Sequence, residues 1–206
     1  MSKESIRVII NIFIAVVTFT AWLRMVFHGG GSFSSRGIWS LKYYTVLSNL
    51  LCAVIACIWL FLYRDPRYER LLFFLKYTGT ATIFLTFLVV VFFLGPIFGY
   101  RMMYVGSNFW FHAFIPLLCA AEFILMDTQV PTGREKILAV IPMFIYGVCY
   151  LSNILINGAG EGQHTNDWYG FTRWGLPAGF AIFVFLCLVV YFTGVLFVQF
   201  SALIHK

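Results

Sequence analysis

The sequence predicts an all-α integral membrane protein with six transmembrane helices. Of its 206 residues, 61% are hydrophobic and only 11% are charged, whereas a soluble domain carries roughly 25% charged residues. The mean hydropathy is +0.88. Apolar runs long enough to cross a bilayer as helices recur along the whole chain, and helices satisfy their own backbone polar groups in lipid.

The six expected spans are separated by short connectors, so residues 1–206 form a single transmembrane domain. The first span begins near Lys3 and Arg7, but it is too long for a secretory signal and no small-residue cleavage pattern precedes Arg24. The second follows a glycine-containing connector, the third follows the charged connector RDPRYER, and the sixth follows a polar, aromatic loop. The predicted spans are Ser5–His28, Ile38–Tyr63, Leu71–Gly95, Asn108–Asp127, Glu135–Ile156 and Arg173–Ile204.

The distribution of Lys and Arg predicts that both termini lie in the cytoplasm. With alternating spans, nine of these residues fall on the side of the termini and five on the other, and an excess of positive charge marks the cytoplasmic side. The connector Arg64–Arg70 and Lys76 supply four of the nine. The net charge of +6 is therefore assigned to membrane topology, and nothing indicates a nucleic-acid surface. The compact loops fit a bacterial inner membrane.

Thr45 and His112 are polar residues near the outer ends of two apolar spans. Polar groups in hydrocarbon are costly and usually face the interior of a bundle. At ~1.5 Å per residue, Thr45 is ~10 Å past Ile38 and His112 is ~6 Å past Asn108. Both spans run inward from the outer face, so the two residues are expected at a common depth. Taken singly, each also fits a packing role, because hydroxyl and imidazole groups are common at helix contacts.

Three polar stripes at helical spacing predict a chamber that opens toward the outer side. Stripes of this kind turn inward because lipid cannot satisfy their hydrogen bonds. The chamber would be lined by Thr45, His112 and Asn153. The stripes are Thr45, Ser48, Asn49, Cys52 and Ala56 in the second span, Asn108, His112, Pro116, Cys119 and Glu122 in the fourth, and Tyr146, Tyr150, Asn153 and Asn157 in the fifth.

Two of these stretches resemble a known family. Residues 42–50, KYYTVLSNL, and 108–122, NFWFHAFIPLLCAAE, are similar to the second-helix and fourth-helix motifs of the androgen-induced transmembrane threonine hydrolases. That family splits fatty-acid esters of hydroxy fatty acids. The resemblance implies that Thr45 is the nucleophile and His112 the catalytic histidine. Asn108, Pro116 and Glu122 match accompanying positions, and the six-span plan with cytoplasmic termini agrees.

The implied chemistry assigns provisional roles to further residues. A threonine hydroxyl needs a base during attack, and His112 would supply it. Asn108 would help to orient the imidazole, Asn49 or Asn153 would donate to the oxyanion, and Asp167 is the best candidate for a third catalytic member. The substrate would be a membrane lipid with long acyl chains, and no cofactor or metal is expected.

Two other classes of protein stay open. A non-enzymatic transporter or scaffold is favoured by Pro116 and Pro142, which interrupt two spans. A metal or haem protein is suggested by His28, His112 and His164, although none of these has the spacing of a helical metal pair. The five cysteines all lie within spans without paired spacing and are interpreted as small apolar residues.

Overall fold

The computed structural model describes residues 2–28, 37–160 and 165–206, and the predicted fold class is confirmed. In these ranges the protein is helical, and six helical stretches are long and apolar enough to cross a membrane. His164, which entered the sequence analysis as a candidate metal ligand, lies outside the described residues. The six stretches are Lys3–His28, Tyr44–Leu62, Pro66–Phe98, Ser107–Met126, Gly133–Asn157 and Leu176–Ile204.

Several of the six stretches are composites of shorter elements. The first, second and sixth are the single helices α1 (Lys3–His28), α2 (Tyr44–Leu62) and α10 (Leu176–Ile204). The third comprises η2 (Pro66–Tyr68), α3 (Glu69–Val89), η3 (Val90–Leu94) and α4 (Gly95–Phe98), and the fourth comprises α6 (Ser107–Phe109), η4 (Trp110–Phe114) and α7 (Ile115–Met126). The fifth comprises α8 (Gly133–Leu138) and α9 (Ile141–Asn157), while η1 (Gly37–Lys42) and α5 (Tyr100–Met103) lie in connectors.

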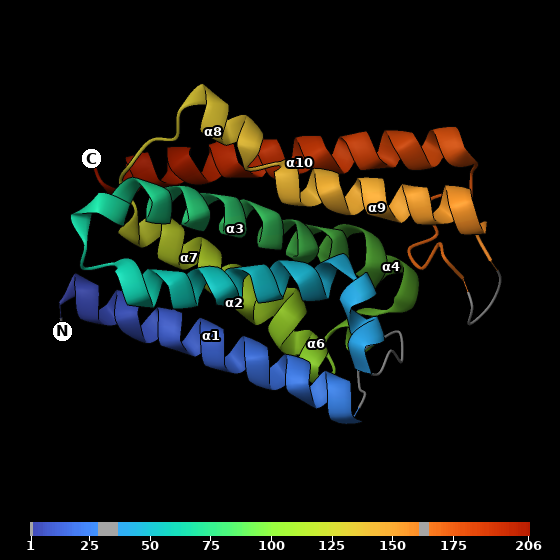
Figure 1. Cartoon of the computed structure of the whole chain (residues 1–206), viewed down its shortest axis with the longest axis horizontal. Coiled ribbons are helices and arrows are strands. Elements are labelled where there is room, and N and C mark those ends of the chain that lie inside the picture. Colours follow the sequence, from blue (N-terminus) through green and yellow to red (C-terminus); the bar gives the residue numbers. More distant parts are fainter. Residues whose placement is uncertain (1, 29–36, 161–164) are drawn as a thin grey trace.

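The long helices lie side by side, with both termini at one end of the bundle (Figure 1). Helix α3 is central, because it packs against α2, α7 and α10, while α1 packs against α2 and α7. Helix α9 packs along α10 at the edge. Gly194 of α10 faces Tyr77 of α3 so closely that an added Cβ would contact the phenol ring. A small residue at this crossing lets the two backbones approach, as is common between membrane helices.

Helix α2 begins later than predicted. The expected second span starts at Ile38, but residues Gly37–Lys42 form the short 3-10 helix η1, and α2 starts at Tyr44. Ile38 and Trp39 in η1 are exposed. Thr45 is therefore in the first turn of its helix, and the depth of ~10 Å expected for it below the start of the span was wrong.

The third and fourth spans each contain a π-helical segment that the sequence analysis did not predict. In η3 the N–H of Gly95 bonds to the carbonyl of Val90, and in η4 the N–H of Ile115 bonds to the carbonyl of Trp110. Each segment ends two residues before a proline, Pro96 or Pro116. A proline has no N–H to complete the usual bond four residues back, and the wider π turn is one way to accommodate this.

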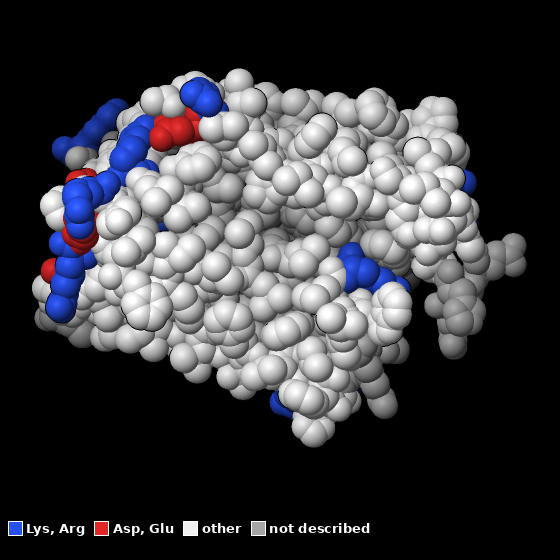
Figure 2. Space-filling view, viewed as in Figure 1, with Lys and Arg blue, Asp and Glu red and all other residues white. Residues whose placement is uncertain are grey.

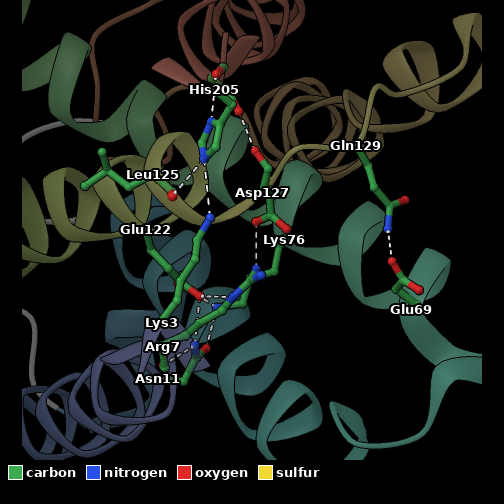
Figure 3. Close-up of polar contacts among 11 residues, drawn as sticks. Lys3, Arg7, Asn11, Glu69, Lys76, Glu122, Leu125, Asp127, Gln129 and His205 are labelled. Atoms are coloured by element: carbon green, nitrogen blue, oxygen red, sulfur yellow. Dashed lines mark hydrogen bonds and ion pairs between the residues drawn. The ribbon is translucent and has the colours of Figure 1, made fainter. Parts of the chain in front are cut away.

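A group of charged side chains at the terminal end of the bundle, here called the buried ion cluster, joins α1, α3 and α7 (Figure 3). Glu122 pairs with Arg7 (Oε1 to Nε, 3.1 Å) and with Lys76 (Oε2 to Nζ, 2.8 Å). Asp127 Oδ2 lies 2.6 Å from Arg7 Nη2. Asn11 donates to Glu122 Oε1 (2.8 Å) and accepts from Lys76. Two cations thus neutralise two carboxylates within the bundle.

The ion cluster changes the interpretation of two cations that the sequence analysis counted as topology signals. Lys76 is on α3, and only 7% of its side chain is exposed, so it is paired inside the bundle. Arg7 is 15% exposed and points into the bundle. The remaining exposed Lys and Arg residues still gather at the end that carries the termini, and few lie toward the other end (Figure 2).

Candidate functional site

Thr45 lies in the first turn of α2 and is half-buried. Its backbone carbonyl accepts hydrogen bonds from Ser48 Oγ at 3.2 Å and from Asn49 Nδ2 at 2.7 Å. The start of the helix is held by Tyr169, whose phenol oxygen accepts from the N–H of Tyr44 at 3.0 Å. Thr45 and Tyr169 also line the same small cavity. Thr45 therefore lies beneath the loop that carries Tyr169.

His112 is buried in the π-helical segment η4, and its Nδ1 lies 2.6 Å from the carbonyl oxygen of Met103. A carbonyl can only accept, so Nδ1 carries the hydrogen, and Nε2 of the neutral ring is the atom able to take a proton. One turn earlier, Asn108 Nδ2 donates to the carbonyl of Met102 at 3.3 Å. Asn108 thus fastens the end of α5, and the adjacent carbonyl of that segment sets the tautomer of His112.

Asn49 connects the two predicted catalytic positions. Its Nδ2 donates both to the carbonyl of Thr45 at 2.7 Å and to the carbonyl of Phe111, the residue before His112, at 3.1 Å. Because an amide nitrogen has two hydrogens, both are used, and Asn49 acts as a clamp rather than as an oxyanion donor. Among the described residues no hydrogen bond joins the side chains of Thr45 and His112.

The predicted polar stripes of the second and fourth spans face the interior. Ser48, Asn49, Cys52 and Ala56 are buried, and so are Asn108, His112, Pro116, Cys119 and Glu122. The polar stripe of the fifth span faces the interior only in part. Tyr150 is buried, but Asn153 accepts a hydrogen bond of 2.9 Å from the exposed Asn157 and sits toward the end of α9. The expectation that Asn157 belongs to an inward-facing stripe was wrong.

Four aromatic side chains gather at the beginning of α2 and are here called the aromatic roof: Tyr146, Trp168, Tyr169 and Phe171. Trp168 Nε1 donates to the phenol of Tyr146 at 3.1 Å, and that phenol donates to the carbonyl of Lys42 at 2.9 Å. Tyr169 and Phe171 are stacked, with ring centroids 5.1 Å apart. Burial raises the pKa of Tyr169 to about 12, so its phenol stays protonated at neutral pH.

Asp167 fastens this loop to α9. Its carboxylate accepts from Tyr150 Oη, from Thr172 N (2.9 Å) and Oγ1 (2.7 Å), and from Phe171 N (2.9 Å). Burial acts to raise the pKa of Asp167, but the hydrogen bonds outweigh it and lower that pKa below its usual value. All of these partners belong to the loop or to α9. In this structure a backbone carbonyl, and not Asp167, orients the imidazole of His112.

A small cavity lies beside Thr45, and a larger cavity adjoins it. The small one, here called the threonine cavity, has a volume of about 30 Å³ and is lined in part by Thr45, Thr86 and Tyr169, which is enough for a water molecule. The larger one of about 440 Å³, here called the apolar groove, lies between α3 and α10 and is lined only by apolar residues. The two share Leu85, Val89, Phe171 and Leu186. An apolar volume therefore borders the space beside the Thr45 hydroxyl.

Glu122 is remote from this region. It lies ten residues after His112 on the same span, which is roughly 15 Å along the helix axis, and both of its oxygens are engaged in the buried ion cluster. Pro116 follows η4 and marks where the span returns to α-helical geometry. Glu122 is therefore held by structural partners of its own, and Pro116 belongs to the local helix geometry.

The fold and the site define an integral membrane protein with a hydroxyl, an imidazole and an amide clamp near the end of the bundle opposite the termini. No family model, no curated protein and no solved structure matches the chain. Within residues 2–28, 37–160 and 165–206, no group of three or more His, Cys, Asp or Glu residues could hold a metal ion.

Proposed function

We propose that the protein is an intramembrane lipid ester hydrolase with Thr45 as nucleophile and His112 as general base. The observation that carries the proposal is the Asn49 clamp, since one amide nitrogen lies within 3.1 Å of the carbonyls of Thr45 and Phe111. This contact holds the first turn of α2 against the segment that bears His112. The resemblance of residues 42–50 and 108–122 to the threonine hydrolases supports the same pair.

In the proposed reaction Thr45 Oγ1 attacks the ester carbonyl carbon, and Nε2 of His112 takes the hydroxyl proton. The tetrahedral intermediate collapses with departure of the alkoxide, which receives the proton from His112. A water molecule then attacks the acyl-threonine, again with His112 as base, and releases the fatty acid. Hydrogen bonds between catalytic groups often tighten only in the substrate complex, so the proposal expects the Thr45–His112 bond to form when an ester enters.

The bond from His112 to Met103 supports its assigned role. A general base needs a fixed tautomer with an unprotonated nitrogen directed at its partner, and an Nδ1–H bond to a carbonyl provides that tautomer. Tyr169, which lines the threonine cavity together with Thr45, is the proposed donor to the developing oxyanion. It replaces Asn49 in that role, because both hydrogens of the Asn49 amide are used.

The proposed substrate is a lipid ester with long acyl chains, such as a fatty-acid ester of a hydroxy fatty acid. The apolar groove of about 440 Å³ would take an acyl chain, since its lining is apolar and adjoins the threonine cavity. Each buried CH₂ group contributes about 0.8 kcal/mol. With the termini in the cytoplasm, as the excess of Lys and Arg at that end favours, the site would lie near the outer face of a bacterial inner membrane.

The test is hydrolysis of such esters by purified wild-type protein, Thr45→Ala, Thr45→Ser and His112→Ala, with Ser48→Ala as the control for a neighbouring hydroxyl on the same helix. We expect loss of turnover in Thr45→Ala and His112→Ala and partial activity in Thr45→Ser. Mass spectrometry after treatment with an acylating probe should find the acyl group on Thr45. Full turnover by Thr45→Ala would refute the proposal.

A transporter is the second candidate, favoured by the two spans that contain π segments beside Gly95–Pro96 and Pro116. Interrupted membrane helices often line transport sites. The same probe experiment separates the two classes, because a transporter with no nucleophile would label no more in wild type than in Thr45→Ala.

A further inference from the structure

A second polar cavity lies at the terminal end of the bundle, far from Thr45, and is here called the terminal cavity. It has a volume of about 500 Å³ and lies between the beginning of α1 and the end of α2. Its lining includes Lys3, Glu4, Arg7, Trp59, Tyr63 and Arg64. The ends of membrane-spanning helices lie at the level of lipid headgroups, so this cavity is at headgroup depth.

The charge of the cavity is positive. Three cations and one carboxylate line it, and among the described residues neither Lys3 nor Arg64 forms an ion pair. Lys3 Nζ lies 3.3 Å from His205 Nε2 (Figure 3), and Arg64 Nε donates to Tyr63 Oη at 3.0 Å. Neither contact is with a carboxylate, so both cations keep their charge available.

Arg7 links the cavity to the interior. Its Nε and Nη2 are held by Glu122 and Asp127 in the buried ion cluster, while Nη1 has no hydrogen bond among the described residues. The guanidinium lies over the ring of Trp59, 5.0 Å from the centroid. Arg7 is therefore a rigid donor whose free edge is set by the fold, in contrast to a mobile surface cation. A planar guanidinium of this kind matches a phosphate oxygen.

The aromatic residues of the cavity fit a lipid. Trp59 and Tyr63 are stacked, with centroids 4.7 Å apart, and amphipathic rings of this type sit at the headgroup level of membranes. On the neighbouring turn of α2, Phe61 is 86% exposed and would face acyl chains. The cavity has cationic walls, lies at headgroup depth and borders an apolar helix face. It therefore suits a lipid with an anionic headgroup and long acyl chains.

We propose that the terminal cavity binds the phosphate headgroup of an anionic phospholipid, through Lys3, Arg7 and Arg64. The shared chemistry is the phosphate anion, and basic pockets between membrane helices bind such headgroups. The proposal does not rest on the hydrolase, because it concerns the opposite end of the bundle.

The test is native mass spectrometry of the full chain released from nanodiscs that contain equal amounts of phosphatidylglycerol and phosphatidylcholine. We expect wild-type protein to retain phosphatidylglycerol preferentially, and the variant Lys3→Gln/Arg64→Gln to lose the preference by roughly fivefold for each charge removed. The matched control is Arg134→Gln, which removes an exposed cation of α8 and should retain the lipid as wild type does. A parallel arm titrates wild-type protein with inorganic phosphate.

Each outcome bears on the proposal. Equal retention of the two lipids by wild type, or equal loss in Arg134→Gln, would overturn it. Displacement of the lipid by millimolar inorganic phosphate would assign the site to free phosphate and overturn the lipid assignment. Circular dichroism of each variant in phosphatidylcholine alone establishes that the fold is intact. A loss of preference in a folded double variant supports the site.

Discussion

The Nδ1 atom of His112 lies 2.6 Å from the carbonyl oxygen of Met103, so the imidazole is oriented by backbone from the connector before its own helix. Asn108 holds the preceding carbonyl of the same segment, that of Met102. In water-soluble hydrolases a carboxylate often has this orienting role. A backbone acceptor achieves the same tautomer without placing another charge in the membrane, where charges are expensive.

His112→Asn should separate the structural role of this residue from its proposed chemistry. An asparagine amide can replace Nδ1–H as a donor to the Met103 carbonyl, but it has no basic nitrogen. We expect near-wild-type thermal stability in detergent and loss of ester hydrolysis, whereas His112→Ala should lose both, since it leaves a buried carbonyl unpaired. Retained hydrolysis in His112→Asn would remove His112 from the proposed mechanism.

Asn49→Leu removes both hydrogen bonds of the clamp at nearly constant volume. We expect hydrolysis to fall at least about tenfold, because misplacement by about 1 Å has large effects on rate, and the free energy of unfolding to fall by about 1–3 kcal/mol. Ser48→Ala is the control on the adjacent position, since its hydroxyl pairs with Thr86 and not with the His112 segment. Equal kinetics for the two variants would contradict the clamp.

Val189→Trp should fill the apolar groove from α10. Val189 lines the groove but not the threonine cavity. We therefore expect a raised KM for esters of long acyl chains and little change for short-chain esters. The control is Leu188→Trp, whose side chain is 50% exposed on the outside of the same helix. If the two variants raise the KM for long chains equally, the groove is not the acyl site.

Glu122→Gln should destabilise the protein strongly. The change leaves Arg7 and Lys76 with a single carboxylate, and removing one partner of a buried pair typically costs about 3–5 kcal/mol. The control is Arg67→Gln, because its pair with Asp65 is exposed and such pairs contribute about 0–1 kcal/mol. Denaturation in mixed micelles would measure both. Similar losses in the two variants would show that the buried ion cluster adds little stability.

Asp167→Asn should weaken the attachment of the aromatic roof in a pH-dependent way. The pKa of Asp167 is lowered in the fold, so its stabilisation is present in full above the unfolded pKa of about 3.9 and is lost as the pH falls through the lower folded value. The difference in Tm between wild type and Asp167→Asn should therefore be largest near pH 7 and should shrink below about pH 4. A difference that grows on acidification would reverse the assigned sign.

The sequence by itself determined the class of fold and the inward faces of the second and fourth spans. Long apolar runs leave helices as the solution in lipid, and polar residues at three- and four-residue spacing must turn away from it. Thr45 and His112 were found in this way, because a polar residue in an apolar run is visible without any knowledge of its neighbours. The roof loop was also recognisable, from its aromatic and polar composition.

Only the tertiary structure decided how these groups meet. Whether Asn49 can donate to an oxyanion or instead binds the carbonyl of Phe111 depends on the position of the helix that carries Phe111. The hydrogen-bond partner of His112 is a backbone carbonyl, and no sequence pattern identifies such a partner. The π segments near Pro96 and Pro116 shift the faces of two helices in a way that spacing rules do not capture. Lys76 was counted only as a topology charge, because linear position cannot show that Glu122, 46 residues away, lies opposite it.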